Sequence, residues 1–143
     1  MSEFFPVTLP TACALGAIYA VLSLLVGIQR GRANTSLGMP DARVAIGEED
    51  KAPPLLIAIR RHAQFAEYVP ISLLLLLLLE LNHAARIALL IFAAMLVISR
   101  LTMMIGIGRV RSPFRTVGNL FQWGMIIFSS LFGLTLAVLH GNI

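Results

Sequence analysis

The chain has 143 residues, of which 58% are hydrophobic and 13% charged, whereas soluble domains carry roughly 25% charged residues. A charged fraction this small cannot cover the surface of a soluble protein of this size. The composition therefore excludes an ordinary soluble domain. The net charge of +4 does not indicate a nucleic-acid-binding protein, because the basic residues flank apolar blocks and form no stripe on a polar face. The single cysteine, Cys13, excludes a disulfide within the chain.

Four apolar segments follow one another along the chain, and each is long enough for a transmembrane helix, which needs about 20 residues. The predicted helices cover about 7–28, 55–81, 84–107 and 114–139. The connection from about residue 29 to 54 is rich in Gly, Pro and charge, and the other two connections are short. The sequence therefore predicts one all-α domain over residues 1–143, an integral membrane four-helix bundle.

The basic residues give the expected orientation of these helices. The first and third connections, with the first turn of the fourth helix, hold seven of them: Arg30, Arg32, Arg43, Lys51, Arg109, Arg111 and Arg115. The opposite side has Arg86 alone. Because Arg and Lys concentrate on the cytoplasmic side of a membrane, we expect both termini on the non-cytosolic side.

The second predicted helix carries a polar cluster near its cytosolic end. Arg60, Gln64 and Glu67 are spaced i, i+4, i+7 and therefore share one helix face, which Tyr68 flanks. A charge such as that of Glu67, at or inside the hydrocarbon boundary, is costly and by default marks a functional site. Arginine binds carboxylates, and Glu67 accepts hydrogen bonds from an ammonium or amide. The cluster therefore suits a small anionic molecule that has its own amine or amide groups.

Structural interpretations of the same residues remain open. Glu67 could form an ion pair with Arg60 or Arg100, and Arg61 could anchor the helix at the membrane interface. Glu80 lies near the other end of the helix, where we expect ordinary helix-end polarity. The three scattered histidines predict no metal site, and the sequence shows no Ser-His-Asp set and no phosphate-binding glycine loop.

The second helix contains a recognisable motif, Arg60-x-x-x-Gln64-x-x-Glu67-Tyr68-x-Pro70. It resembles the second-helix signature of the MAPEG family, the membrane-associated proteins in eicosanoid and glutathione metabolism. The likeness, closest to the bacterial branch, extends to further positions: Arg43, Gly47, Glu80-Leu81-Asn82, Arg100-Leu101, Gly106, Arg115 and Gly118. It covers most of the chain from about residue 15 onward.

The resemblance implies a homotrimer that binds glutathione, as co-substrate, between neighbouring subunits near the cytosolic face. The residues implied to bind glutathione are Arg32, Arg60, His62, Gln64, Glu67, Tyr68 and Arg100. Arg115 matches the arginine that stabilises the glutathione thiolate. The implied activity is that of a transferase or peroxidase, in which the thiolate attacks a lipophilic electrophile arriving through membrane lipid. A bacterial cytoplasmic (inner) membrane is the implied location.

Two departures from the family pattern leave other functions open. Many members have Asn where this chain has Gln64, and active relatives carry tyrosines or other polar aromatics after the Arg100-Leu101 pair, where this chain has Thr102-Met103-Met104-Ile105-Gly106-Ile107. That apolar stretch could accept an acyl chain. The alternatives are therefore a non-catalytic lipid- or amphiphile-binding membrane protein and a structural membrane subunit whose polar cluster is an ion-pair lock.

Overall fold

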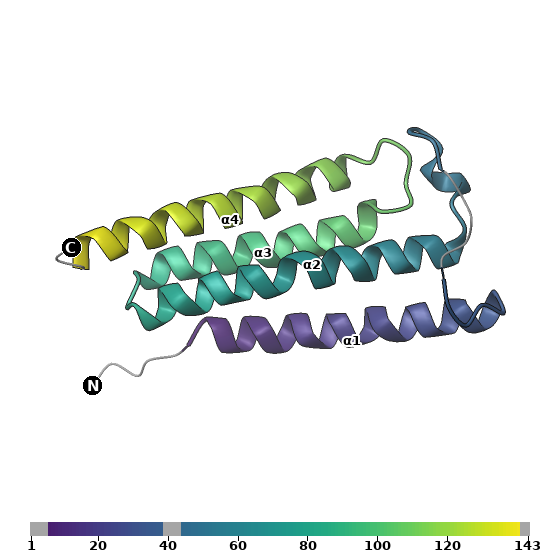
Figure 1. The fold of residues 1–143 in the computed structure, drawn as a ribbon. Coiled ribbons are helices and arrows are strands. Elements are labelled where there is room, and N and C mark those ends of the chain that lie inside the picture. The colour runs from purple at the N-terminus through teal and green to yellow at the C-terminus, as the bar shows by residue number, and fades with distance from the viewer. Residues whose placement is uncertain (1–5, 39–43, 141–143) are drawn as a thin grey trace.

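Four long antiparallel helices form the molecule in a computed structural model, which describes residues 6–38 and 44–140 apart from the side chain of residue 140 (Figure 1). The helices are α1 (Thr8–Arg32), α2 (Pro54–Leu81), α3 (Arg86–Gly106) and α4 (Pro113–His140), and a short 3₁₀ helix, η1 (Glu49–Lys51), precedes α2. The start of α1 and the end of α4 lie at the same end of the bundle (Figure 1). The described residues contain no strand, which confirms the predicted all-α fold.

All four helices are long and apolar enough to cross a membrane. Large apolar side chains face outward on every helix, among them Leu24, Leu81, Ile87, Leu120 and Leu134. Water would penalise so extensive an apolar surface, whereas lipid tails solvate it. The chain is therefore an integral membrane protein.

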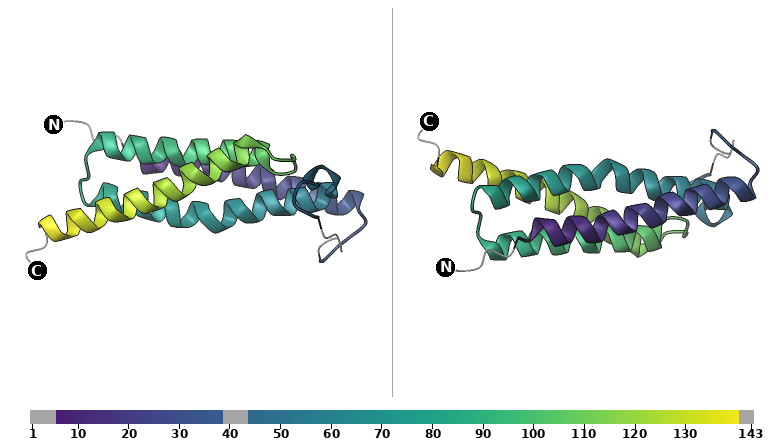
Figure 2. Two further views of the ribbon diagram at one scale, coloured as in Figure 1. Left: turned by 90° about the horizontal axis from the view of Figure 1, so that it is seen from above. Right: turned by 90° about the horizontal axis from the view of Figure 1, so that it is seen from below.

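The core lies around α2, which packs against α1, α3 and α4. Leu15 of α1, Leu76 of α2, Leu96 of α3 and Met125 of α4 are fully buried there. Figure 2 shows α4 crossing obliquely over the other helices. Because α1 and α4 do not contact each other within the described residues, the bundle is open between them.

The first helix ends at Arg32, four residues beyond the predicted end at residue 28. Its last turn contains two arginines, whose positive charge is favourable near the negative end of the helix dipole. Arg30 Nη1 also donates hydrogen bonds to the carbonyl oxygens of Ser36 and Gly38, both at 3.1 Å. The arginines thus extend the helix and hold the start of the long connection against it.

Glu80 fixes the opposite end of α1 onto α2. The residue is 5% exposed, and its carboxylate accepts hydrogen bonds from the backbone N–H groups of Val7 and Thr8, the latter at 3.0 Å. A carboxylate at a helix N-terminus satisfies unpaired donors and is favoured by the helix dipole. Glu80 is therefore a buried link between two helices, in contrast to the ordinary helix-end polarity expected from the sequence.

Two close contacts position the turn between α3 and α4. A Cβ atom added at Gly106 would lie 2.6 Å from the backbone nitrogen of Arg115, so only glycine lets the start of α4 approach the end of α3 so closely. Arg61 of α2 donates from Nη2 to the carbonyl oxygen of Ile107 at 2.9 Å. Arg61 therefore caps the C-terminal end of α3, which is a more specific role than the interfacial anchor considered from the sequence.

Candidate functional site

A cavity of about 530 Å³ opens at the end of the bundle that carries the first and third connections. Its walls come from the first half of α2, the segment 44–52 before α2, the α3–α4 turn and the first turn of α4. Its polar lining consists of Glu49, Arg60, Gln64, Glu67 and Arg115. The volume lies within the range of about 300–1,000 Å³ usual for small-molecule sites.

The α2 residues reach this cavity because their helical spacing puts them on one face. Arg60 and Glu67 are exposed, and neither forms an ion pair with any residue that the structure describes. The Oε1 atom of Gln64 is buried yet accepts no hydrogen bond from the described residues. The cavity thus holds a free guanidinium, a free carboxylate and an unused acceptor. The ion pairs of Glu67 with Arg60 or Arg100, considered from the sequence, are not formed within the described chain.

Arg115 enters the cavity from the first turn of α4. Its side chain is 53% exposed, and its Nη1 atom lies 3.6 Å from Oε1 of Glu49. The other carboxylate oxygen of Glu49 accepts the N–H of Gly47 at 3.1 Å. Glu49 therefore ties the connection before α2 to α4 across the mouth of the cavity. The sequence analysis missed this residue, although the acidic run at 48–50 was a visible signal for it.

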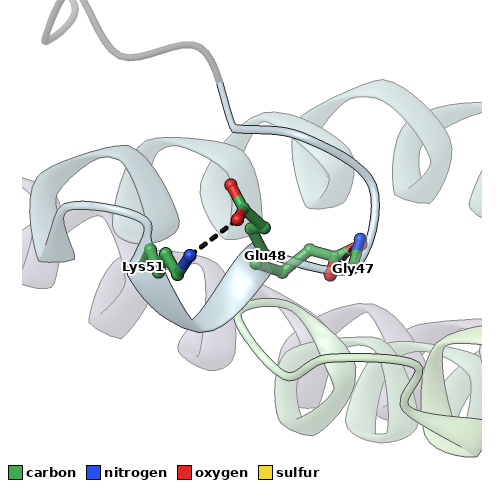
Figure 3. Close-up of polar contacts among 4 residues, drawn as sticks. Gly47, Glu48 and Lys51 are labelled. Carbon is green, nitrogen blue, oxygen red and sulfur yellow. Dashed lines mark hydrogen bonds and ion pairs between the residues drawn. The ribbon is translucent and has the colours of Figure 1, made fainter.

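A tight turn that contains Gly47 precedes η1, the short helix that carries Glu49 (Figure 3). Gly47 has φ +92°, a left-handed conformation that favours glycine. Lys51 Nζ lies 2.6 Å from Glu48 Oε1 in an exposed ion pair. The turn places Val44, Ala45 and Ile46 on the cavity wall. Arg43, part of the motif and of the expected basic side, lies outside the described residues.

The other predicted binding residues do not line the cavity. The His62 ring packs against Tyr19 of α1, with centroids 4.8 Å apart, and thus faces α1. The Tyr68 ring lies 5.7 Å from the guanidinium carbon of Arg100. Arg32 is exposed at the end of α1. Of the predicted residues, the structure therefore brings together Arg60, Gln64, Glu67 and Arg115.

Arg100 lies inside the bundle, with 2% of the residue exposed. Its Nη1 donates to the backbone carbonyl of Gln64 at 3.2 Å, its Nε to Ser99 Oγ at 3.2 Å, and its Nη2 to Gln122 Oε1 at 2.6 Å. Gln122 Nε2 in turn donates to Ser72 Oγ at 3.0 Å. We call Ser72, Ser99, Arg100 and Gln122 the buried network. It joins α2, α3 and α4, and the sequence analysis did not identify Gln122.

The end of α3 gives the cavity an aliphatic wall. Ile107 lines the cavity, whereas Met103 is buried, with its side chain against Gly118 of α4. Residues 102–107 contain no tyrosine, so this segment supplies no aromatic hydroxyl to the site. Because Met103 is already packed, the apolar stretch leaves less open surface for an acyl chain than its composition suggested.

The comparisons with known proteins agree with this architecture. The MAPEG family profile matches residues 8–137, nearly the whole chain. No curated protein and no solved structure matches it. The match covers the four apolar helices and the cavity residues of α2 and α4. The resemblance noted in the second-helix motif is thereby confirmed, and the chain belongs to the MAPEG family.

Proposed function

We propose that this protein is a membrane-bound glutathione transferase or peroxidase that acts on lipophilic electrophiles. The MAPEG family, to which the chain belongs, includes glutathione transferases and peroxidases. The observation that best supports the proposal is the convergence of Arg60, Gln64 and Glu67 with Arg115 on one cavity. These residues come from helices far apart in the sequence, and their chemistry fits the different ends of one tripeptide.

The polar groups that α2 brings to the cavity, those of Arg60, Gln64 and Glu67, each have a counterpart in glutathione. Arg60 would bind one carboxylate through two parallel N–H donors. Glu67 would accept from the ammonium group, and the unused Oε1 of Gln64 would accept from an amide N–H. A ligand with charges of both signs thus satisfies groups that the described chain leaves without partners.

Arg115 would act on the sulfur. A guanidinium beside a thiol favours the thiolate, the nucleophilic form. The thiolate sulfur then forms a bond to the electrophilic carbon of the second substrate, and the leaving group departs with the electron pair of the bond that breaks. Ile57 and Ile107 on the cavity wall would receive the apolar part of that substrate. The protein needs no nucleophile of its own.

In the proposed active form the protein is a homotrimer, with a second copy completing the site. Glu67 is exposed on a membrane helix, and the same face of α2 continues with exposed Ile71, Leu74, Leu78 and Leu81. A charge facing lipid costs about 3 kcal/mol or more near the bilayer centre. A neighbouring subunit over this face would remove Glu67 from lipid and bury the apolar residues beyond it.

The proposed location is a bacterial cytoplasmic membrane. The end of the bundle with the cavity carries the basic connections, which the distribution of Arg and Lys assigns to the cytosol. Glutathione is water-soluble and would enter there, while the electrophile would arrive from lipid. Both termini would lie on the non-cytosolic side.

An apolar groove favours a second candidate function, non-catalytic binding of a lipid or amphiphile. The groove has a volume of about 240 Å³ and lies between α1 and α2. Leu15, Phe65, Val69 and Leu73 line it, with Tyr19 as a polar tip. An acyl chain fits such a surface, and a protein using it alone would not need glutathione.

A calorimetric titration of reduced glutathione into detergent-purified protein tests the proposal. We expect saturable binding to the unmodified protein and to Arg86→Ala, which removes an exposed arginine at the other end of the bundle. Binding should be at least tenfold weaker in Arg60→Ala. Absence of binding at millimolar glutathione would overturn the proposal, and lipid co-purifying with such a protein would support the second candidate.

A further inference from the structure

Arg100 brings a positive charge into the bundle without a negative partner among the residues that the structure describes. It is 2% exposed, and its three side-chain hydrogen bonds go to a hydroxyl, an amide and a backbone carbonyl. Among residues 6–38 and 44–140, no Asp or Glu forms an ion pair with it. A guanidinium keeps its proton in proteins, and burying a charge without a counter-ion is costly. Its hydrogen bonds are thus satisfied while its charge is not neutralised.

Gln122 occupies the place where a counter-ion would be expected. Its Oε1 atom lies 2.6 Å from Nη2 of Arg100, and its Nε2 atom donates to Ser72 Oγ. The residue is 1% exposed. A glutamate has almost the same shape and would form an ion pair there. The chain instead has an amide, which holds the guanidinium in place and leaves the charge intact.

This charge lies directly behind the cavity. Nη1 of Arg100 donates to the backbone carbonyl of Gln64 at 3.2 Å, and Gln64 itself lines the cavity. Tyr68 of α2 is the titratable group that contacts the guanidinium. Because Arg100 is buried and bonded to the backbone of a residue that lines the cavity, its field is weakly screened there.

The charged groups of the cavity itself nearly cancel. The lining has two arginines and two glutamates: Arg60, Arg115, Glu49 and Glu67. Outside the lining, Arg61 adds positive charge at the carbonyl of Ile107. The sign of the potential in the cavity therefore depends strongly on charges behind its wall, of which Arg100 is the most buried.

We infer that Gln122, by holding Arg100 without neutralising it, gives the cavity a positive potential that favours an anionic sulfur over a neutral one. This inference rests on the proposed function and deepens it. Arg100 and Gln122 are positioning residues here, since neither lines the cavity. They act on the charge state of the bound thiol, in addition to the direct contact proposed for Arg115.

Gln122→Glu neutralises the charge with little change of shape. A unit charge about 10 Å away at an effective permittivity of about 20 changes a pKa by roughly one unit, or about tenfold in the thiol–thiolate equilibrium. We expect the pKa of bound glutathione, followed by thiolate ultraviolet absorbance, to rise by about that amount. Arg100→Met removes the charge and should shift the pKa in the same direction, which provides a second test if Gln122→Glu fails to fold.

Two control variants distinguish the effect of neutralising Arg100 from the effect of disrupting the buried network. Gln122→Met disrupts the buried network but leaves Arg100 charged, so the pKa of the bound thiol should not rise. Gln29→Glu adds the same negative charge on α1, which does not line the cavity, and should leave the pKa unchanged. Equal shifts in Gln122→Met and Gln122→Glu would mean that the network acts through structure alone, and would overturn the inference.

A second readout distinguishes this inference from the proposed function. Glutathione sulfonate and S-methylglutathione share one tripeptide but differ in charge at the sulfur. We expect the unmodified protein to prefer the sulfonate, and the preference to fall about tenfold in Gln122→Glu. An unchanged preference with intact binding would overturn this inference alone. Absence of glutathione binding to the unmodified protein would overturn the proposed function and the inference together.

Discussion

Two glutamates on α2 show how differently one residue type is used at the two ends of the bundle. Glu80 is buried, and both of its carboxylate oxygens accept backbone N–H groups at the start of α1. Glu67 is exposed beside a cavity and forms no ion pair within the described chain. Both charges lie in a membrane helix, yet one holds two helices together and the other remains available to a ligand or a second subunit. The two residues carry the same charge but differ in their partners. Glu80, whose oxygens already accept hydrogen bonds, has a structural role, whereas Glu67, which has no such partner within the described chain, is the candidate for function.

We expect the largest effect on activity from a substitution at the end of the bundle that carries the cavity. Arg115→Ala should lower the turnover of a lipophilic electrophile about 100- to 1,000-fold, since a positioned donor to a developing anion typically contributes this much. The free energy of unfolding should change by less than about 1 kcal/mol, because the ion pair with Glu49 is partly exposed. Initial conjugation rates and detergent unfolding curves measure the two effects. Arg109→Ala, in the nearby turn, is the control, and an equal loss in both variants would contradict the role of Arg115.

The next largest effect is expected on the free energy of unfolding, from a substitution at the end of the bundle away from the cavity. Glu80→Gln should lower the free energy of unfolding by about 1–3 kcal/mol, because one buried backbone N–H group loses its acceptor. Glu67→Gln should change it by less than about 0.5 kcal/mol, because Glu67 forms no ion pair within the described chain whose loss would destabilise the fold. Unfolding in mixed detergents compares the pair directly. A larger loss in Glu67→Gln would reverse the assignment of the two glutamates.

Two adjacent arginines at the end of the bundle that carries the cavity allow a similar comparison between a ligand-binding and a structural residue. Arg60 faces the cavity, whereas Arg61 donates to the carbonyl oxygen of Ile107 at the end of α3. Arg60→Ala should weaken glutathione binding at least tenfold and leave stability unchanged. Arg61→Ala should lower the free energy of unfolding by about 1–2 kcal/mol and weaken binding less. Calorimetry and unfolding on the same preparations test both, and loss of binding in Arg61→Ala without loss of stability would refute the distinction.

The smallest effect concerns the ion pair at the mouth of the cavity. Glu49→Gln should free the guanidinium of Arg115 and strengthen the binding of an anionic ligand about two- to threefold, since partly exposed ion pairs contribute at most about 1 kcal/mol. Glu48→Gln breaks the exposed pair with Lys51 and should have no effect on binding. Weaker binding in Glu49→Gln would instead show that Glu49 orients Arg115 for the ligand.

The sequence was informative wherever function depends on spacing along one helix. Four apolar runs predicted the four membrane helices, and the spacing of Arg60, Gln64 and Glu67 predicted their common face. The family motif added Arg115, which spacing alone could not join to α2. These features are local or carried by a motif, so they can be recognised without knowing how the helices pack.

The partners of Arg100 could not be predicted in this way. Gln122 lies 22 positions away on another helix, and its meeting with Arg100 depends on how α4 crosses α3. Glu80 presents the same difficulty, since its partners Val7 and Thr8 lie more than seventy positions earlier. A polar residue in an apolar helix indicates that a partner is needed, but the packing of the bundle determines which one.

The central claim is that the cavity lined by Arg60, Gln64, Glu67 and Arg115 binds glutathione, through side-chain groups of α2 that have no partner among the described residues. Titration of reduced glutathione into the unmodified protein, Glu67→Gln and Glu80→Gln tests it most directly, with affinity expressed per folded molecule. The account predicts saturable binding that is unchanged in Glu80→Gln and at least tenfold weaker in Glu67→Gln. Absence of binding to the unmodified protein, or equal affinities in the two variants, would contradict it.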